Sequence, residues 1–281
     1  MPFIVSVEEA IKLFPQYRFV KALTPSEQKA AFLVQDKNGE SLCLKIISPE
    51  YELDRLKREL IALQRLNHPN IVRLKEYTYS SRPGNVLHYM VEEFIDGDDL
   101  TDLLGPEKKW SPEKSASFFL DFFEGLSELK KVNIVHRDLK PSNIRVRKDG
   151  KPAIIDFGLA RHLDLSDLTR TEDGAAIGTP KYFAPEQFNG TKHDIDHRTD
   201  LYAAGLLMFE TLVGLHPYWT PGISIEELRQ HAIVSTDFLQ HPDLQKQPAN
   251  IKMLVKRLLE KERVNRPHEA RVALTILSKG R

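Results

Sequence analysis

The fold is decided by the stretch His136-Arg137-Asp138-Leu139-Lys140-Pro141-Ser142-Asn143. A tight turn brings together an aspartate, a lysine two positions later and an asparagine three positions beyond it. Asp156-Phe157-Gly158 begins thirteen positions after Asn143. These groups offer a carboxylate to orient a hydroxyl, a cation for a moving phosphoryl group and two oxygen ligands for magnesium. The pattern indicates phosphoryl transfer, which depends mainly on positioning and charge neutralisation.

The sequence around this stretch reads as helices with one short hairpin. A helix is expected after Ser111-Pro112-Glu113, because serine can cap a helix and proline suits its first turn. Two strand-like runs, residues 143–147 and 152–155, are joined by the turn Lys148-Asp149-Gly150, and a long loop follows to about residue 186. Residues 201–213 are apolar on nearly all sides, which predicts a helix buried at the centre of a lobe. Amphipathic helices, one of them a surface helix within residues 224–241, are expected for the remainder.

The front part of the chain has a different pattern. Residues 18–95 read mostly as strands, with Asp36-Lys37-Asn38-Gly39 as a hairpin turn. One helix is expected over residues 51–66, where leucines recur at helical spacing until His68-Pro69-Asn70 ends it. The fold class is therefore α+β, with a strand-rich front portion and a larger helical portion. Ligand sites favour clefts between such lobes.

Composition narrows the function. The 281 residues include 40 basic and 40 acidic side chains, so no net charge draws the chain to nucleic acid or anionic lipid. A single cysteine, Cys43, leaves no internal disulfide and is typical of a reducing compartment. The first 14 residues lack the features of a signal peptide, and no apolar run reaches membrane-spanning length. We expect a soluble, cytoplasmic protein with neither nucleic acid nor membrane as a partner.

From about residue 17 to residue 271 the sequence resembles the eukaryotic-like (Hanks-type) protein kinase family. The resemblance rests on the motifs quoted above together with Ala184-Pro185-Glu186 and Asp200-Leu201-Tyr202-Ala203-Ala204-Gly205, in the family's order and spacing. It implies a bilobal fold with an extension at residues 1–16, a small lobe at 17–95 and a large lobe at 96–281. It also implies ATP with Mg²⁺, or alternatively Mn²⁺, and a protein substrate with a serine or threonine acceptor. The lysine in Asp-Leu-Lys-Pro-Ser-Asn is similar to serine/threonine kinases rather than tyrosine kinases.

The resemblance also assigns roles. Asp138 corresponds to the catalytic aspartate, Lys140 to the phosphate-contacting lysine, and Asn143 and Asp156 to the magnesium ligands. Lys45 corresponds to the third-strand lysine, and its partner is expected to be Glu59 in the helix of the front lobe. The alternative is that both are solvated charges, but Lys45 stands among apolar residues where a lone ammonium is costly.

Further roles concern the loop before residue 186 and the large lobe. The resemblance implies that Thr179 lines the floor for the acceptor and that Asp200 anchors the catalytic loop. Glu186 is expected to form a buried structural ion pair with Arg266. In the family, an arginine at the position of Arg137 is usually balanced by a phosphate, so autophosphorylation is expected at Thr171 or Thr169. Alternatively, Asp173 or Glu172 supplies that negative charge.

The sequence departs from the family at the nucleotide site. Thr24, Ser26 and Lys29 stand where three glycines would cover the phosphates. The segment can still form a hairpin but cannot pack as tightly on ATP. Lys29 could reach a phosphate as a point charge, although the sequence favours a solvated surface lysine.

The adenine site departs from the family as well. Glu92 stands at the gatekeeper position and Arg145 where an apolar floor is usual, so each is expected to be paired or turned outward. Arg145 could also stack on the base. The other expected nucleotide contacts are the backbones of Glu93 and Ile95, the small hydrophobic side chain Cys43, and Asp99.

These observations leave competing functions open. The first is an active serine/threonine kinase, because Lys45, Glu59, Asp138, Lys140, Asn143 and Asp156 are all present. The second is a pseudokinase that binds or scaffolds with weak or absent nucleotide binding. A third is a small-molecule kinase, against which Thr179, Ala184-Pro185-Glu186 and the helix of Asp200 favour a protein acceptor. A fourth is a different donor chemistry, such as nucleotidyl transfer.

Overall fold

The computed structural model describes residues 2–79, 87–162, 180–188 and 195–279. They form two compact units. The first comprises residues 1–67 and 72–96, and the second comprises residues 68–71 and 97–281. Within the described ranges, no helix is long and apolar enough to cross a membrane.

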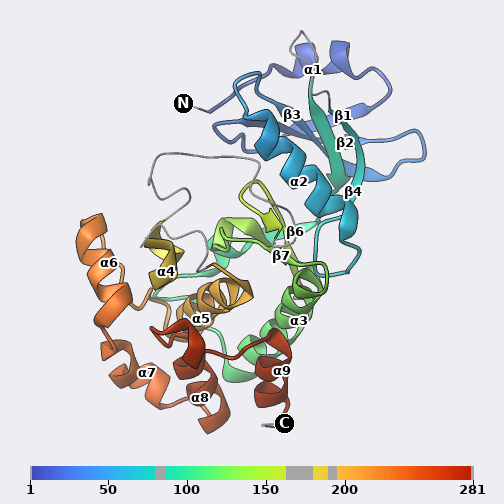
Figure 1. Ribbon diagram of the computed structural model, residues 1–281. Coiled ribbons are helices and arrows are strands. Elements are labelled where there is room, and N and C mark those ends of the chain that lie inside the picture. The colour runs from blue at the N-terminus through green and yellow to red at the C-terminus, as the bar shows by residue number, and fades with distance from the viewer. Residues whose placement is uncertain (1, 80–86, 163–179, 189–194, 280–281) are drawn as a thin grey trace. The chain divides into compact units, whose positions relative to one another are not determined.

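The first unit is built on an antiparallel sheet with strand order β1-β2-β3-β5-β4 (Figure 1). Its strands are β1 Arg18–Ala22, β2 Lys29–Gln35, β3 Ser41–Ile47, β4 Leu74–Thr78 and β5 Tyr89–Glu93. The predicted turn between β2 and β3 is confirmed. Asp36 Oδ1 accepts from the backbone N–H groups of Asn38 and Glu40 at 2.9 and 2.8 Å, and Gly39 adopts φ 81°.

The two faces of this sheet differ in chemistry. Because side chains alternate along a strand, Ala30, Phe32 and Val34 share one face with Leu44 and Ile46 of β3. These residues form a buried cluster that includes Ala10 and Phe14, which belong to helix α1 Val7–Leu13 and its C-cap. Residues near the N-terminus, expected as an extension, therefore pack on the sheet. The opposite face carries Lys29, Lys45 and Glu92.

Helix α2, Leu53–Arg65, confirms the predicted helix of the first unit. Leu56, Leu60 and Leu63 are buried at helical spacing, and Glu59 is buried on the same side. The helix ends shortly before Pro69, as the sequence predicts.

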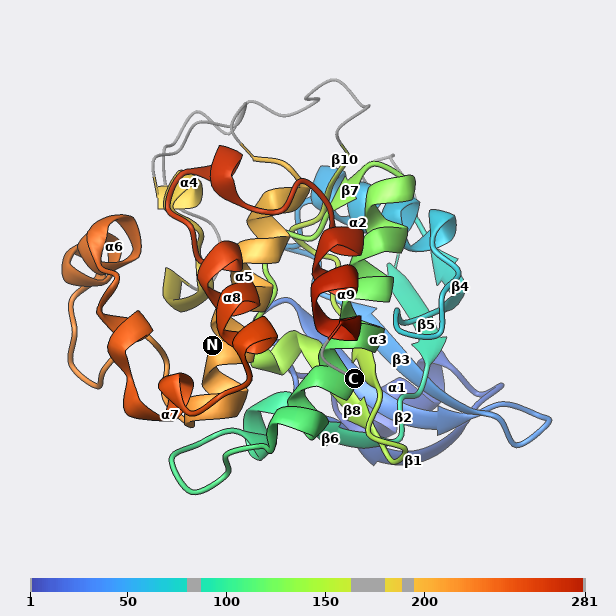
Figure 2. The ribbon, with the colours of Figure 1, turned by 90° about the horizontal axis from the view of Figure 1, so that it is seen from below.

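The second unit is largely helical, and Figure 2 shows α3, α5, α8 and α9 grouped together. Ser111 caps α3 by accepting from Lys114 N at 3.2 Å, and Pro112 occupies the first turn, as predicted. Residues 199–213 of α5 are all buried, which confirms the central helix. The helices are α3 Pro112–Lys131, α4 Pro185–Phe188, α5 His197–Val213, α6 Ile225–Val234, α7 Pro242–Gln245, α8 Ala249–Leu258 and α9 Ala270–Ser278.

Short strands complete the second unit. One sheet has the order β6-β8-β9, and β10 pairs with β7. The expected hairpin is present as β8 and β9. Residues 68–71 belong to this unit because Asn70 Nδ2 donates to Asp121 O at 2.6 Å and Asn70 O accepts from Ile154 N at 2.9 Å. The strands are β6 Gly97–Asp99, β7 Ile134–Val135, β8 Ile144–Arg147, β9 Pro152–Ile154 and β10 Arg161–His162.

Close packing of α5 on α8 gives a test of the core. A Cβ placed on Gly205 would lie 2.7 Å from Leu258 Cβ, an atom fixed to the backbone that cannot swing away. We expect Gly205→Ala to lower the free energy of unfolding by about 1–3 kcal/mol, measured by urea denaturation. The control is Gly125→Ala in α3, where the nearest atom is 3.4 Å away. It should be neutral or gain up to about 1 kcal/mol in helix propensity. Equal effects of the two substitutions would contradict this account of the packing.

Candidate active site

Asp138 lies at the centre of a network in the second unit. Its Oδ2 accepts from Lys140 Nζ at 2.7 Å and from Asn143 Nδ2 at 3.0 Å. Asn143 Nδ2 also lies 2.7 Å from the Asp138 carbonyl oxygen, which closes the turn. The structure thus brings together the three residues that the sequence pattern singles out. An aspartate held this way can accept a hydrogen bond from an incoming hydroxyl, and the nearby ammonium can face a phosphoryl group.

Asp200 anchors the segment of residues 136–143, the catalytic loop, which carries Asp138. The Asp200 carboxylate, on buried α5, accepts from His136 N at 2.8 Å and from Arg137 N at 2.9 Å. Burial raises the pKa of Asp200, and the nearby His136 and these two backbone N–H groups oppose that rise. Arg137 adopts φ 69°, a strained value for a side chain of its size, which the two hydrogen bonds help to maintain. The expected anchoring role of Asp200 is confirmed.

Asn143 and Asp156 are brought close by the β8–β9 hairpin. Ile144 pairs with Ile154, and Asn143 O accepts from Ile155 N at 2.9 Å, so Asp156 follows directly beside Asn143. Asp156 adopts φ 60° and its Oδ1 accepts from Gly158 N at 3.2 Å. The described residues contain no cluster of three or more His, Cys, Asp or Glu side chains that could hold a metal. Two oxygen ligands suit magnesium, which is commonly bound through one or two protein carboxylates, waters and substrate phosphates.

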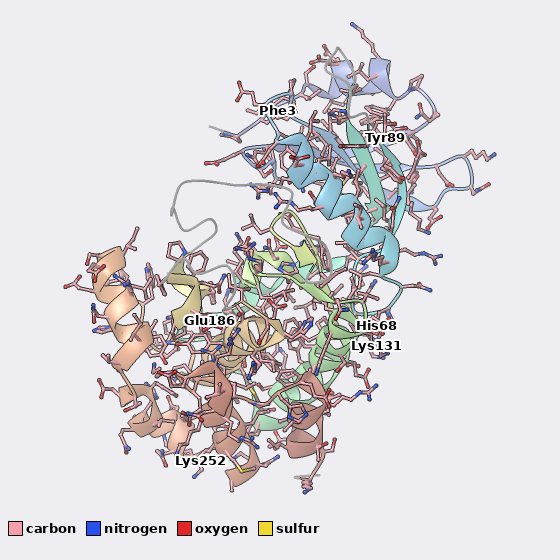
Figure 3. The ribbon with its side chains drawn as sticks, viewed as in Figure 1. Phe3, His68, Tyr89, Lys131, Glu186 and Lys252 are labelled. Carbon is pink, nitrogen blue, oxygen red and sulfur yellow. The ribbon has the colours of Figure 1, made fainter. Side chains whose placement is uncertain are left out.

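Glu186 and Arg266 form the predicted buried ion pair. The two Arg266 terminal nitrogens lie 2.7 and 2.8 Å from the two carboxylate oxygens of Glu186, which is labelled in Figure 3. Thr199 Oγ1 also donates to Glu186 at 2.8 Å. Next to this pair, Gln187 Nε2 donates to Arg137 O at 2.9 Å, which ties α4 to the catalytic loop. Sequence reasoning did not identify Gln187, because no motif distinguishes it from an ordinary surface glutamine.

Arg145 is partly buried and paired, which agrees with the sequence prediction. Its Nη1 lies 2.9 Å from Asp99 Oδ1, and Nη2 donates to Gly97 O. The two strands set this pairing, because Asp99 of β6 stands directly opposite Arg145 of β8. Asp99, expected as a nucleotide contact, therefore holds Arg145. Stacking of Arg145 on a nucleotide base stays a prediction.

The first unit contradicts the expected pair of Lys45 with Glu59. Glu59 Oε1 lies 2.5 Å from Lys29 Nζ, and Glu59 Oε2 accepts from Tyr51 Oη at 3.0 Å. Lys45 Nζ instead lies 2.6 Å from Glu92 Oε2. The physical reason is that buried Glu92 requires a cation, and Lys45 is its diagonal neighbour on the same face of the sheet. Glu92 is therefore paired, as expected.

Lys29 also differs from the sequence prediction of a solvated surface lysine. Its side chain is 9% exposed and its ammonium reaches Glu59. The loop that leads to it is closed by Ser26, whose Oγ accepts from Lys29 N at 3.0 Å and whose N–H donates to Lys29 O at 2.9 Å. This loop joins β1 to β2, so the expected hairpin is present without the three glycines.

The remaining sequence predictions have different outcomes. Thr169, Thr171 and Thr179 lie outside the described residues, as do Glu172 and Asp173. Cys43 is partly buried on β3 opposite Glu92. Ile95 is buried, and Glu93 N donates to Arg73 O at 2.9 Å. Contacts of Cys43, Glu93 and Ile95 with a nucleotide stay predictions.

The chain matches the family described as protein kinase domain over residues 29–275. It therefore belongs to the protein kinase family. A probable serine/threonine-protein kinase of Streptomyces coelicolor is 30% identical over 218 residues, covering 75% of this chain and 32% of that protein. A probable serine/threonine-protein kinase of Clostridium perfringens is 28% identical over 251 residues, covering 86% and 35%.

A third relative is the probable serine/threonine-protein kinase PknB of Bifidobacterium longum, 34% identical over 190 residues, which cover 64% of this chain and 27% of that protein. The chain thus spans about a third of the length of the curated relatives that it matches.

The segment before α4 contains a further buried group that the sequence did not reveal. Tyr182 Oη donates to Glu210 at 2.7 Å, and Lys181 Nζ lies 3.3 Å from the same carboxylate. The His216 ring contacts the Tyr182 ring edge-on, with centroids 5.3 Å apart. His216 Nδ1 accepts from Tyr218 N and Trp219 N at 3.1 and 3.0 Å, so a neutral ring is favoured.

Burial, together with the nearby Lys181 ammonium, lowers the pKa of His216 from 6.5 to about 3. Between about pH 6.5 and pH 3, this histidine is therefore protonated in the unfolded chain but neutral in the folded chain. Its contribution makes the free energy of unfolding fall as the pH drops through this range. This histidine should contribute a slope of at most about 1.4 kcal/mol per pH unit. We expect His216→Gln to flatten the dependence of the unfolding free energy on pH in that window, while the exposed His268→Gln keeps the wild-type slope. An unchanged slope in His216→Gln would contradict the assignment.

Proposed function

We propose that this protein is a serine/threonine protein kinase that transfers the γ-phosphate of ATP to serine or threonine hydroxyls of a protein. The observation that supports this most directly is the Asp138 carboxylate, held by Lys140 and Asn143 on a loop fixed by Asp200. These are groups that phosphoryl transfer needs, held together by hydrogen bonds. The serine/threonine kinases among the relatives support the acceptor class.

Each residue has a distinct task in this proposal. Asp138 accepts the hydrogen bond of the acceptor hydroxyl and takes its proton as the hydroxyl attacks. Lys140, 2.7 Å from Asp138, places a positive charge beside the phosphoryl group as negative charge spreads over its oxygens. Asn143 and Asp156 would hold Mg²⁺, or alternatively Mn²⁺. The ion would neutralise phosphate charge when bound.

The proposal extends to autophosphorylation, the kind of acceptor, the location and the partners of the protein. Autophosphorylation at Thr171 or Thr169 is supported by Arg137, whose guanidinium would face the added phosphate. A protein acceptor is supported by Ala184-Pro185-Glu186 and by the helix of Asp200. A cytoplasmic location is supported by the single cysteine, and the balanced charge argues against nucleic acid or membrane partners.

A second candidate function is a pseudokinase scaffold, and one observation favours it. Lys45, which the resemblance assigns to ATP, lies 2.6 Å from the buried Glu92 carboxylate. A lysine bound in this way has less of its charge available for a phosphate. The scaffold would bind a protein partner with weak or no response to nucleotide.

Two measurements separate the candidates: phosphotransfer from Mg-ATP, compared between the wild type and Asp138→Asn, and thermal stabilisation by Mg-ATP. Asp138→Asn removes the acceptor-facing carboxylate but keeps the size of the side chain, so we expect phosphotransfer from Mg-ATP to myelin basic protein to fall about 10²- to 10⁴-fold. Its thermal stabilisation by Mg-ATP should persist. Asp149→Asn in the exposed turn between β8 and β9 serves as the control and should keep wild-type activity. Wild-type protein with neither phosphotransfer nor a thermal response to Mg-ATP would favour the scaffold.

A further inference from the structure

One face of the sheet in the first unit carries two largely buried lysines beside a buried glutamate. Lys29 of β2 stands opposite Ile47, and Lys45 of β3 stands opposite Ala31 and Met90. Because opposed residues share a face, the two lysines are diagonal neighbours on it. Glu92 of β5 lies on that face too, two positions along its strand from Met90. The side chains are 9%, 13% and 3% exposed for Lys29, Lys45 and Glu92.

Helix α2 supplies the second carboxylate, and its two oxygens are both engaged. Glu59 is fully buried, with Oε1 on the Lys29 ammonium and Oε2 on the Tyr51 hydroxyl. A buried carboxylate is tolerated only when paired and hydrogen-bonded, so these two contacts account for Glu59. The cation that fixes α2 to the sheet is therefore Lys29.

The second ion pair on this face joins Lys45 to Glu92. Glu92 Oε2 lies 2.6 Å from Lys45 Nζ, whereas Glu92 Oε1 is buried without a hydrogen-bond partner in the described part of the chain. The stability of this carboxylate depends strongly on the one ammonium, because leaving it unpaired would be costly. Each of the two lysines thus lies beside one of the two carboxylates.

We propose that Lys29 is the residue that positions α2 for phosphotransfer through Glu59, while Glu92 holds Lys45. The inference rests on the proposed kinase function. The family resemblance assigns the contact with Glu59 to Lys45. In this proposal Lys29 makes that contact, and Lys45 is held by Glu92.

The position of Lys29 gives this pair a second consequence. The Lys29 backbone closes the loop of residues 24–29 through Ser26, and the Lys29 side chain reaches α2. One residue thus joins the helix to the loop expected over the phosphates. A shift of α2 would move that loop directly, without a change at Lys45.

The test combines unfolding and activity measurements in double-mutant cycles. We expect Lys29→Met and Glu59→Gln each to lower stability in urea, and the double variant to lose much less than the sum of the two. The cycle of Lys45→Met with Glu59→Gln should be nearly additive, and the cycle of Lys45→Met with Glu92→Gln should show strong coupling. Strong coupling of Lys45 to Glu59, or none between Lys29 and Glu59, would overturn the proposal.

The functional arm uses Mg-ATP and myelin basic protein at a temperature where circular dichroism shows every variant folded. Lys29→Met should lower kcat about tenfold or more with KM for ATP changed little, as expected for a positioning residue. Lys29→Arg should recover most of kcat because arginine keeps the ion pair. Lys21→Met, an exposed lysine on β1, is the matched control and should behave as wild type. Wild-type kcat in folded Lys29→Met would overturn the positioning role.

Failure of the proposed function would look different. If the wild-type protein transfers no phosphate, the kinase proposal fails for this acceptor, whereas the unfolding cycles still identify the partner of Glu59. If the wild type is active and the cycles assign Glu59 to Lys45, the kinase proposal stands and the inference about Lys29 is wrong.

Discussion

The second unit depends on one carboxylate, that of Asp200. Two consecutive backbone N–H groups of the catalytic loop donate to it from residues 136 and 137, and it sits on a helix that is buried along almost its whole length. A carboxylate in such surroundings is tolerable only with donors on both oxygens. The same two bonds hold Arg137 in a left-handed conformation and so aim the next residue, Asp138. The hydrogen bonds to Asp200 therefore both stabilise the fold of the loop and orient its catalytic aspartate.

Buried charges elsewhere follow the same rule. Glu186 faces both terminal nitrogens of Arg266, and Glu59 faces Lys29. Such pairs add little net stability compared with apolar packing, but removing one partner is expensive. Each pair therefore fixes a geometry more than it strengthens the fold. In the second unit, the pair of Glu186 with Arg266 links α4 to the segment after α8.

The sequence predicts most of the fold because its patterns are local. The turn Asp36-Lys37-Asn38-Gly39 marks the hairpin of β2 and β3, leucine spacing marks α2, and Ser111 with Pro112 marks the start of α3. The catalytic loop is predictable for the same reason, since Asp138, Lys140 and Asn143 are close in sequence. The partner of Glu59 could not be predicted this way. Lys29 and Lys45 share one face of the sheet, and the strand pattern allows either to reach α2. Their choice depends on Glu92, a long-range contact that no local pattern reports.

The two departures at Lys29 and Glu92 become intelligible when they are considered together. Without Lys29, Glu59 would lose the ammonium that it faces, and without Glu92, Lys45 would lose the carboxylate that it faces. Removing one member of a buried ion pair typically costs several kcal/mol. Together the two departures give each buried carboxylate of this face a lysine of its own and keep Glu59 bound to a strand lysine. The lysine at position 29 and the glutamate at position 92 thus belong to one arrangement of neighbouring ion pairs.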